Sequence, residues 1–157
     1  MKKLLKVSSV LAILAGVVMV AGGIWGIVFT YNNVARENIT TSKEASIPGV
    51  AVRGPFTLKA QADIIRVHTL KATGGKTYAE MPGQIPKLDE SGNPVLDKDG
   101  KAVTVPNDAR NMWVTATTLM TALNLGIITY AFSGIVLLFG LISIWTGIIF
   151  CILSKKN

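Results

Sequence analysis

Side chains that could do acid–base, nucleophilic or metal chemistry are few in this sequence. His68 is the only histidine and Cys151 the only cysteine among the 157 residues. A histidine-based metal site or a cysteine–histidine nucleophile pair cannot be built from them, because we expect an apolar helix to place them on opposite sides of a membrane. His68 could pair with Asp63 or Glu80, but a hydrogen-bonded histidine on a helix surface is the simpler interpretation. The sequence therefore predicts no catalytic residue, no metal ligand and no cofactor.

Two short motifs partly match ligand-binding loops. Asp97, Asp99 and Gly100 resemble part of a calcium loop, but the twelfth position, where such loops carry a glutamate, is Asp108. Residues 72–77 contain two glycines and a lysine, as phosphate loops do, but lack the four-residue spacer between the glycines. We interpret the first motif as a turn and the second as a helix end.

The positive charge is concentrated at the two ends of the chain. The formal net charge is +7, and five lysines lie in the terminal segments, at positions 2, 3, 6, 155 and 156. A nucleic-acid-binding protein needs a basic patch on a folded face, whereas these lysines flank apolar segments and would meet lipid head groups. We therefore expect the lipid bilayer, and no nucleic acid, as a partner.

Two apolar segments account for much of the hydrophobic half of the sequence. Residues 7–29 carry no charge and, as a helix, are long enough to cross the ~30 Å hydrocarbon core of a bilayer. No charge occurs between Arg110 and Lys155, and residues 125–153 are strongly apolar. The more polar residues 112–124 predict an outward extension of the same second helix.

The ends of these helices can also be estimated. The first helix continues to about Arg36 or Glu37, and Asn107 or Asp108, after a proline, is a suitable start for the second. A cleaved signal peptide is the alternative for the first segment. Its apolar run is longer than the usual ~7–15 residues, however, and the cleavage pattern around Ala21 is poor.

The lysine distribution predicts the topology. Short basic flanks remain in the cytoplasm, whereas a middle domain of this length can be translocated despite its charges. We expect a mainly α membrane protein, in which two transmembrane helices form an antiparallel hairpin with a small external α+β domain. The expected order is cytoplasmic residues 1–6, a span at 7–29, an extracytoplasmic domain at 30–111, the helix extension at 112–124, a span at 125–153 and a cytoplasmic tail at 154–157.

Small residues in the two spans predict close helix packing. Gly22 and Gly26 are spaced by four residues in the first span, as are Ser143 and Gly147 in the second. Helices associate in lipid where small residues allow their backbones to approach. These four residues would line a packing face, either within the hairpin or against a partner.

The external domain has two recognisable elements. Residues 56–73 predict a helix that ends at Gly74 and Gly75. Short apolar runs at 95–96 and 102–105 flank the Asp-Gly turn at 99–100 and predict a β-hairpin.

Residues 54–57, 61–65, His68 and 72–80 resemble a group of small actinobacterial two-pass membrane proteins, many of which are named aromatic ring-opening dioxygenase. The close resemblance covers about 27 residues and includes the two-helix plan. It implies a bacterial cell membrane as the location. The oxygenase name implies several histidine and carboxylate ligands around iron, which a single histidine cannot supply.

We expect a non-enzymatic membrane interaction protein, such as an accessory subunit of a larger complex, with a membrane-protein partner or a second copy of itself. An independent extracytoplasmic sensor or ligand-binding module is the alternative, and a metal-dependent dioxygenase is a remote third. The candidate contact residues are Phe56, Ile64, Ile65, His68, Gly74, Gly75, Lys76, Tyr78 and Glu80.

Overall fold

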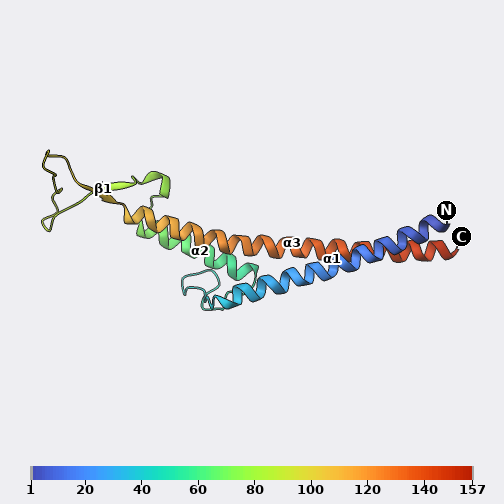
Figure 1. Cartoon of the computed structure of the whole chain (residues 1–157). Coiled ribbons are helices and arrows are strands. Elements are labelled where there is room, and N and C mark those ends of the chain that lie inside the picture. Colours follow the sequence, from blue (N-terminus) through green and yellow to red (C-terminus); the bar gives the residue numbers. More distant parts are fainter. Residues whose placement is uncertain (1, 157) are drawn as a thin grey trace.

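The computed structural model describes residues 2–156 and is mainly helical. Two long helices, α1 (Lys2–Arg36) and α3 (Asp108–Lys156), run antiparallel, so that the N- and C-termini lie together at one end of an elongated molecule (Figure 1). The shorter α2 (Pro55–Ala72) lies along the outer part of α3. A 3₁₀ turn, η1 (Tyr78–Glu80), and two short strands, β1 (Gln84–Pro86) and β2 (Thr104–Pro106), complete the far end.

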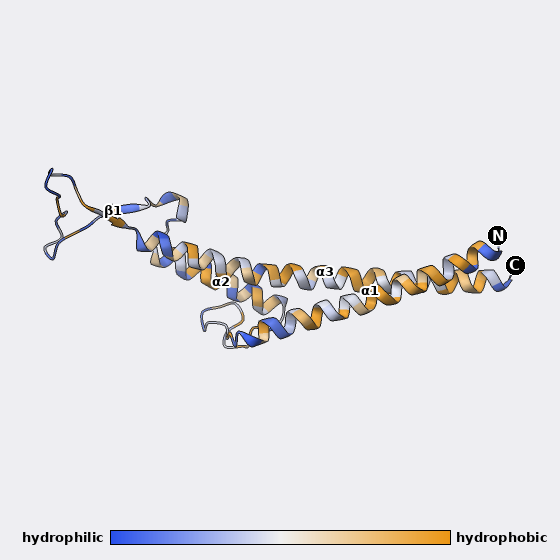
Figure 2. Cartoon of the chain, viewed as in Figure 1, coloured by the Kyte–Doolittle hydropathy of each residue, from blue (hydrophilic) through white to orange (hydrophobic). Residues whose placement is uncertain are grey.

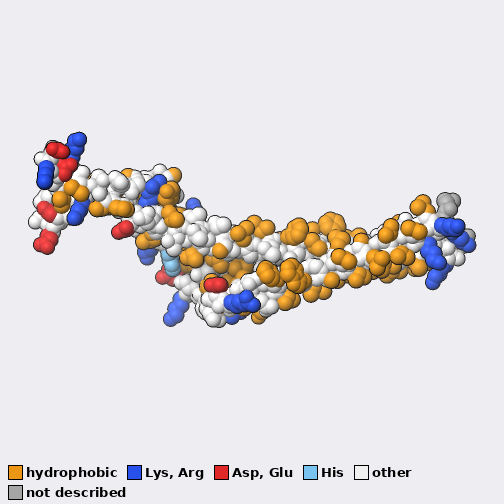
Figure 3. All heavy atoms as spheres, viewed as in Figure 1, with side chains coloured by type: hydrophobic (Ala, Val, Ile, Leu, Met, Phe, Trp, Pro, Cys, Tyr) orange, Lys and Arg blue, Asp and Glu red, His pale blue; other side chains and the backbone are white. Residues whose placement is uncertain are grey.

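Helices α1 and α3 are both long and apolar enough to cross a membrane. Their 35 and 49 residues correspond to about 52 and 74 Å of helix. Both helices consist mostly of hydrophobic residues, orange in Figure 2, and large apolar side chains cover the visible face of the helix pair in Figure 3. Val18 is 71% and Trp145 66% exposed. The helix ends agree with the sequence prediction, because α1 stops at Arg36 and α3 starts at Asp108, after Asn107.

The two long helices touch through small residues that recur every seven positions. The buried positions of α1 at this spacing are Ser9, Gly16, Gly23 and Thr30, with Gly26 buried between the last two; on α3 the buried positions at this spacing are Ser133, Gly140 and Gly147. A side chain at Gly16 would meet backbone, since its Cβ would lie 2.6 Å from the carbonyl oxygen of Gly140. In a bilayer the hydrophobic effect does not drive helices together, because lipid tails are as apolar as the side chains. Helices there associate through close backbone approach of this kind.

Hydrogen bonds supplement this packing near the termini. Ser9 Oγ donates to the carbonyl of Gly147 at 2.7 Å, and Ser143 Oγ donates to the carbonyl of Ala12 at 2.8 Å. Of the four predicted packing residues, Gly26, Ser143 and Gly147 lie in the contact between α1 and α3. Gly22 does not, because no atom of the described chain lies within 4 Å of where its Cβ would be.

Helix α2 begins and ends where its sequence favours. Pro55 occupies the first turn, where its missing amide hydrogen costs nothing, and the Thr57 hydroxyl oxygen accepts from the amides of Arg53 and Gly54 at 3.0 and 3.1 Å. At the other end Gly74 and Gly75 adopt φ values of 62° and 82°, and the amide of Gly75 donates to the carbonyl of Leu70 at 2.7 Å. The helix predicted at 56–73 is therefore present, one residue displaced.

The core of the outer region includes part of α3. Val52, Leu58, Ala62 and Leu123 form one buried cluster. This core therefore extends beyond residue 111 into α3. The segment predicted as a helix extension, 112–124, supplies one wall of this core, because its polar face is exposed while Leu123 packs on α2.

The tip of the molecule differs from the predicted β-hairpin. The turn between Leu96 and Ala102 forms, with an antiparallel bridge between those two residues, but the named strands β1 and β2 pair outside it. The reason is a third segment, which closes a ring of hydrogen bonds. The amide of Lys87 donates to the carbonyl of Val103 at 2.7 Å, the amide of Val103 to the carbonyl of Val95 at 2.8 Å, and the amide of Val95 to the carbonyl of Lys87 at 2.8 Å. We call residues 84–106 the head.

The head is built from an eight-residue repeat. Pro86-Lys-Leu-Asp-Glu-Ser-Gly is followed by Pro94-Val-Leu-Asp-Lys-Asp-Gly. Asp89 Oδ1 accepts from the amides two and four residues later, at 2.9 and 2.8 Å, and Asp97 Oδ1 repeats both contacts at 2.9 Å. These carboxylates cap their own loops, which is what turn aspartates do, and the segment interpreted as a turn rather than a calcium loop has that structure.

Candidate functional site

The candidate site lies where α1 and α3 separate. Beyond Gly26 and Ser133 the two helices diverge, and the first turns of α2 fill the space between them (Figure 1). Leu58 of α2 packs against α3 at Gly126, where the helix has no side chain. A Cβ at Gly126 would lie 3.1 Å from Leu58 Cδ1 and 4.0 Å from Val34 Cγ2 of α1. Side chains of all three helices therefore converge at this junction.

The loop between α1 and α2 is fastened to the same junction. Tyr130 of α3 donates its hydroxyl to the carbonyl of Arg53 at 2.6 Å. Within the loop, Val52 is fully buried and its amide donates to the carbonyl of Ile39 at 2.9 Å. The entry to α2 is thus held against α3, which fixes the position of the junction residues.

A cavity of about 560 Å³ opens at the junction. Its volume is within the range of small-molecule sites in proteins, about 300–1,000 Å³. Its lining comes from the C-terminal end of α1, from the following turn, from one side of α2 and from about three turns of α3: Phe29, Thr30, Asn33, Val34, Glu37, Ile39, Leu58, Gln61, Ile65, Leu119, Ala122, Leu123, Leu125, Gly126 and Thr129.

One lining residue has an unmet hydrogen-bonding group. The side-chain oxygen of Gln61 is buried and has no hydrogen-bond partner among residues 2–156. A buried polar atom without a partner destabilises a protein, by about 1–3 kcal/mol, and calls for an explanation. Glu37 is the one charged residue among the described residues that line the cavity.

A second, more polar groove of about 370 Å³ lies between α2 and α3. Lys59, Asp63 and Arg66 line it from α2, and Lys59 and Asp63 form an ion pair. Thr117, Thr121 and Asn124 are among its lining residues on α3. Because the ion pair already neutralises two of the three charges, this groove is a weaker candidate for a binding site.

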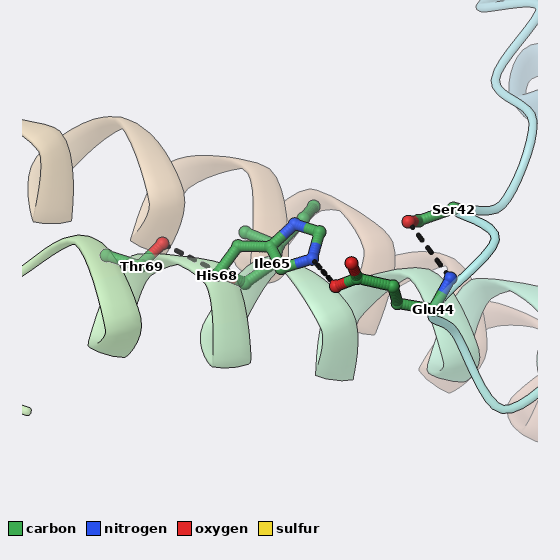
Figure 4. Close-up of polar contacts among 5 residues, drawn as sticks. All are labelled: Ser42, Glu44, Ile65, His68 and Thr69. Carbon is green, nitrogen blue, oxygen red and sulfur yellow. Dashed lines mark hydrogen bonds and ion pairs between the residues drawn. The ribbon is translucent and has the colours of Figure 1, made fainter.

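The predicted contact residues on α2 have different environments. Phe56 is 80% exposed, whereas Ile64 is buried and Ile65 lines the cavity. His68 Nε2 lies 2.8 Å from Glu44 Oε2 of the loop before α2 (Figure 4), and this neighbour holds the pKa of the Glu44 carboxyl below its usual value. His68 therefore has a hydrogen-bonding partner on the protein surface, although neither Asp63 nor Glu80 is that partner.

The predicted contact residues after α2 have mainly structural positions. The carbonyl of Lys76 accepts from Trp113 Nε1 at 2.8 Å, and the Arg110 guanidinium lies 3.9 Å from the centre of the Tyr78 ring. Glu80 Oε2 accepts from the amide of Thr77 at 2.6 Å, and this hydrogen bond lowers the pKa of the Glu80 carboxyl. Gly74, Gly75 and the residues after them thus turn the chain back onto α3.

Two residues important for this arrangement were not among the predicted site residues. Trp113 is 4% exposed and joins the end of α2 to α3, with the Arg66 guanidinium 5.8 Å from its ring centre. A tryptophan in the polar segment before the apolar span was the available signal. Gln61 carried no comparable signal, because an unpaired amide is recognised only from the three-dimensional packing.

No three histidine, cysteine, aspartate or glutamate side chains between residues 2 and 156 are placed so that they could hold a metal ion. Comparisons with protein-family models, with curated proteins and with solved structures give no match.

Proposed function

We propose that this chain is a non-enzymatic integral membrane protein of the bacterial cell membrane, which crosses the bilayer twice and binds another membrane protein through its outer region. The observation that carries the proposal is the surface of the α1–α3 pair. Its small residues face inward and its large apolar residues face outward, so that lipid or a partner must cover them.

Both termini are proposed to lie in the cytoplasm. The lysines at positions 2, 3, 6, 155 and 156 gather at one end of the helix pair (Figure 3). Short basic flanks are retained on the cytoplasmic side, which supports this orientation. The resemblance to small actinobacterial two-pass proteins supports the same plan.

An accessory role in a larger complex is supported by the shape of the outer region. We call α2 and the N-terminal part of α3 the stalk; it places the head at the end of the molecule opposite the two termini (Figure 1). Phe56, Leu88 and Leu96 are 80%, 57% and 60% exposed, which leaves apolar side chains for a partner to cover. The His68 imidazole is engaged by Glu44 on the protein surface, which supports a structural role for it.

The orientation predicts which positions a membrane-impermeant thiol reagent can reach. In a background with Cys151 replaced by serine, Lys98→Cys in the head is expected to react in intact spheroplasts, in which the reagent can reach the outer face of the cell membrane. Lys155→Cys, the matched control at the other end, is expected to react only after permeabilisation. The reverse pattern, or a mature chain that begins after Ala21, would contradict the proposed topology.

The interaction role predicts a stoichiometric partner. Tagged protein extracted in mild detergent is expected to co-elute with one membrane protein or with an untagged copy of itself. Phe56→Asp is expected to lose most of this partner, whereas Val67→Asp, which also places a charge at an exposed apolar position of α2, is expected to keep it. Elution of the wild-type protein as a lone monomer would argue against the role.

A ligand-binding module is the second candidate function. It is favoured by the cavity at the three-helix junction and by the unpaired amide oxygen of Gln61.

A further inference from the structure

The polar groove between α2 and α3 lies where the proposed outer membrane surface would be. Asn124 lines its inner end and directly precedes residues 125–153, the strongly apolar part of α3. Thr117 lines its other end, seven residues or about 10 Å further out along the helix. The head-group layer on each side of a bilayer is about 5–8 Å thick. The groove therefore reaches through this layer, a step that rests on the proposed insertion of α1 and α3 in a bilayer.

The groove contains one cation without a counter-ion. Lys59 and Arg66 against Asp63 give its lining a charge of +1, and Lys59 and Asp63 form an ion pair. Arg66 is exposed and forms no ion pair and no hydrogen bond with any residue between 2 and 156, while its guanidinium lies 5.8 Å from the centre of the buried Trp113 ring. Its N–H donors are therefore available. The ion pair weakens the groove as a general binding site, but the unpaired arginine gives it a preference for anions.

The wall formed by α3 adds neutral hydrogen-bond donors. Thr117, Thr121 and Asn124 are exposed on one face of this helix, at spacings of four and three residues. The hydroxyls of Thr118 and Thr129 donate to the carbonyls four residues earlier, whereas those of Thr117 and Thr121 make no hydrogen bond with any residue between 2 and 156. A planar guanidinium beside free hydroxyl and amide groups is suited to the several oxygens of a phosphate.

The same face of α3 becomes apolar immediately below the groove. Ile128 and Ile135 lie four and eleven residues after Asn124, on the same side of the helix, and are 62% and 51% exposed. An acyl chain that lies along these two side chains would place its head group at Asn124 and Arg66. A phospholipid therefore matches both parts of this face, whereas a soluble anion matches only the upper part.

We propose that this groove binds the phosphate of an outer-leaflet phospholipid, with Arg66 as the cationic donor and the polar side chains of α3 as neutral donors. One acyl chain lies on α3 along Ile128 and Ile135. Because the walls of the groove belong to α2 and α3, the bound head group connects these two helices at the membrane surface.

The test measures lipid binding to the full-length protein in a neutral detergent. The probe is dioleoyl-phosphatidylglycerol, and the comparison is dioleoylglycerol, which has the same acyl chains and no phosphate. Native mass spectrometry counts the lipid that each protein retains. The phospholipid is expected to bind about tenfold more tightly, as hydrogen bonds to a charged group predict. Equal retention of the two lipids would overturn the phosphate site, and displacement of the phospholipid by millimolar inorganic phosphate would overturn the lipid as its source.

Two matched pairs of variants separate the groove from general attraction of charge. Arg66→Gln is expected to lower the affinity for phosphatidylglycerol about tenfold. Arg36→Gln, which removes the same charge from the exposed end of α1, is expected to leave it unchanged. Thr121→Val is expected to weaken binding severalfold, whereas Thr118→Val removes a hydroxyl that already donates to a backbone carbonyl and is expected to have no effect. All four positions are exposed, and an unchanged elution volume shows that each variant is folded.

The outcomes are separate from those of the topology test. Equal loss of affinity in Arg66→Gln and Arg36→Gln would overturn the groove as a site, whatever the thiol labelling shows. Loss of a co-purified protein from Arg66→Gln, at unchanged phosphatidylglycerol binding, would also overturn it and would place an acidic segment of that partner in the groove. A head that reacts only after permeabilisation would overturn the outer-leaflet assignment without changing the lipid affinities.

Discussion

Replacing Gly140 by leucine is expected to separate α1 from α3. A Cβ at this position would lie 2.8 Å from the amide nitrogen of Val20 and 2.9 Å from the carbonyl oxygen of Gly16. These are backbone atoms of the opposite helix, so the clash cannot be relieved by a side-chain rotation. Overpacking of a tight interface usually costs about 1–3 kcal/mol, and the rigid neighbours place this substitution at the upper end.

The loss would extend beyond the glycine itself. The hydrogen bonds from Ser9 and Ser143 to carbonyl groups of the opposite helix lie on the terminal side of Gly140 and require the same close approach. We therefore expect Gly140→Leu to unfold at a clearly lower temperature, or at a lower concentration of denaturing detergent, than the wild type. Loss of the monodisperse elution peak of the purified protein measures this unfolding.

Gly134→Leu is the matched control for this substitution. It places the same side chain in the same helix six residues earlier, where no atom of residues 2–156 lies within 4 Å of the added Cβ. Its unfolding midpoint is expected to stay close to that of the wild type. If the two variants unfold together, the seven-residue contact between α1 and α3 does not hold the pair.

Trp113→Ala is expected to release the end of α2 from α3. The indole is 4% exposed, and its Nε1 donates to the carbonyl of Lys76 at 2.8 Å and lies 3.3 Å from Thr73 Oγ1. Truncation of a buried tryptophan to alanine typically costs about 3–5 kcal/mol. The α1–α3 pair does not depend on this contact and should remain intact.

Limited trypsin digestion measures this local effect. The variant is expected to be cut after Lys71 or Lys76 at least ten times faster than the wild type, at unchanged elution volume. Trp113→Phe keeps most of the ring and loses only the two hydrogen-bond contacts, so it should show a much smaller increase. Equal cleavage of wild type and Trp113→Ala would mean that the turn after α2 is held by other contacts.

The helices could be predicted well because their signals are local. The absence of charge over residues 7–29 and from Asn111 to Ser154 is enough to identify the two long elements. Proline at the start and glycines at the end are enough for α2. Each of these signals lies within the helix that it predicts or directly beside it, so tertiary packing did not change the outcome.

The helix contact was only partly predicted because the small residues of α1 can be grouped at a four-residue or at a seven-residue spacing. The four-residue spacing of Gly22 and Gly26 suggested one face, whereas the buried residues Gly16, Gly23 and Thr30 recur every seven positions, and of the predicted pair only Gly26 lies in the contact. Sequence spacing alone does not say which side of a glycine-rich helix faces a neighbour. A search for seven-residue recurrence in both segments would have favoured the observed face.

The head and the cavity illustrate two different limits. The eight-residue repeat that begins at Pro86 and at Pro94 is visible in the sequence. The Asp-Gly pair at 99–100 is also typical of a two-stranded hairpin, and this second pattern led to the wrong strand pairing. The cavity, in contrast, results from the divergence of two helices and the insertion of a third. No local pattern encodes the empty space or the unmatched oxygen of Gln61 beside it.

The closed hydrogen-bond ring in the head also bears on how this chain can change in length. The head leaves and rejoins the stalk through β1 and β2, where Gln84 lies opposite Pro106. Its two aspartate-capped loops draw their hydrogen bonds from within themselves. An insertion or deletion inside one loop would therefore leave the pairing of β1 with β2 and the packing of the stalk unchanged. The length of the chain can vary in these loops without a change in the fold of the remaining residues.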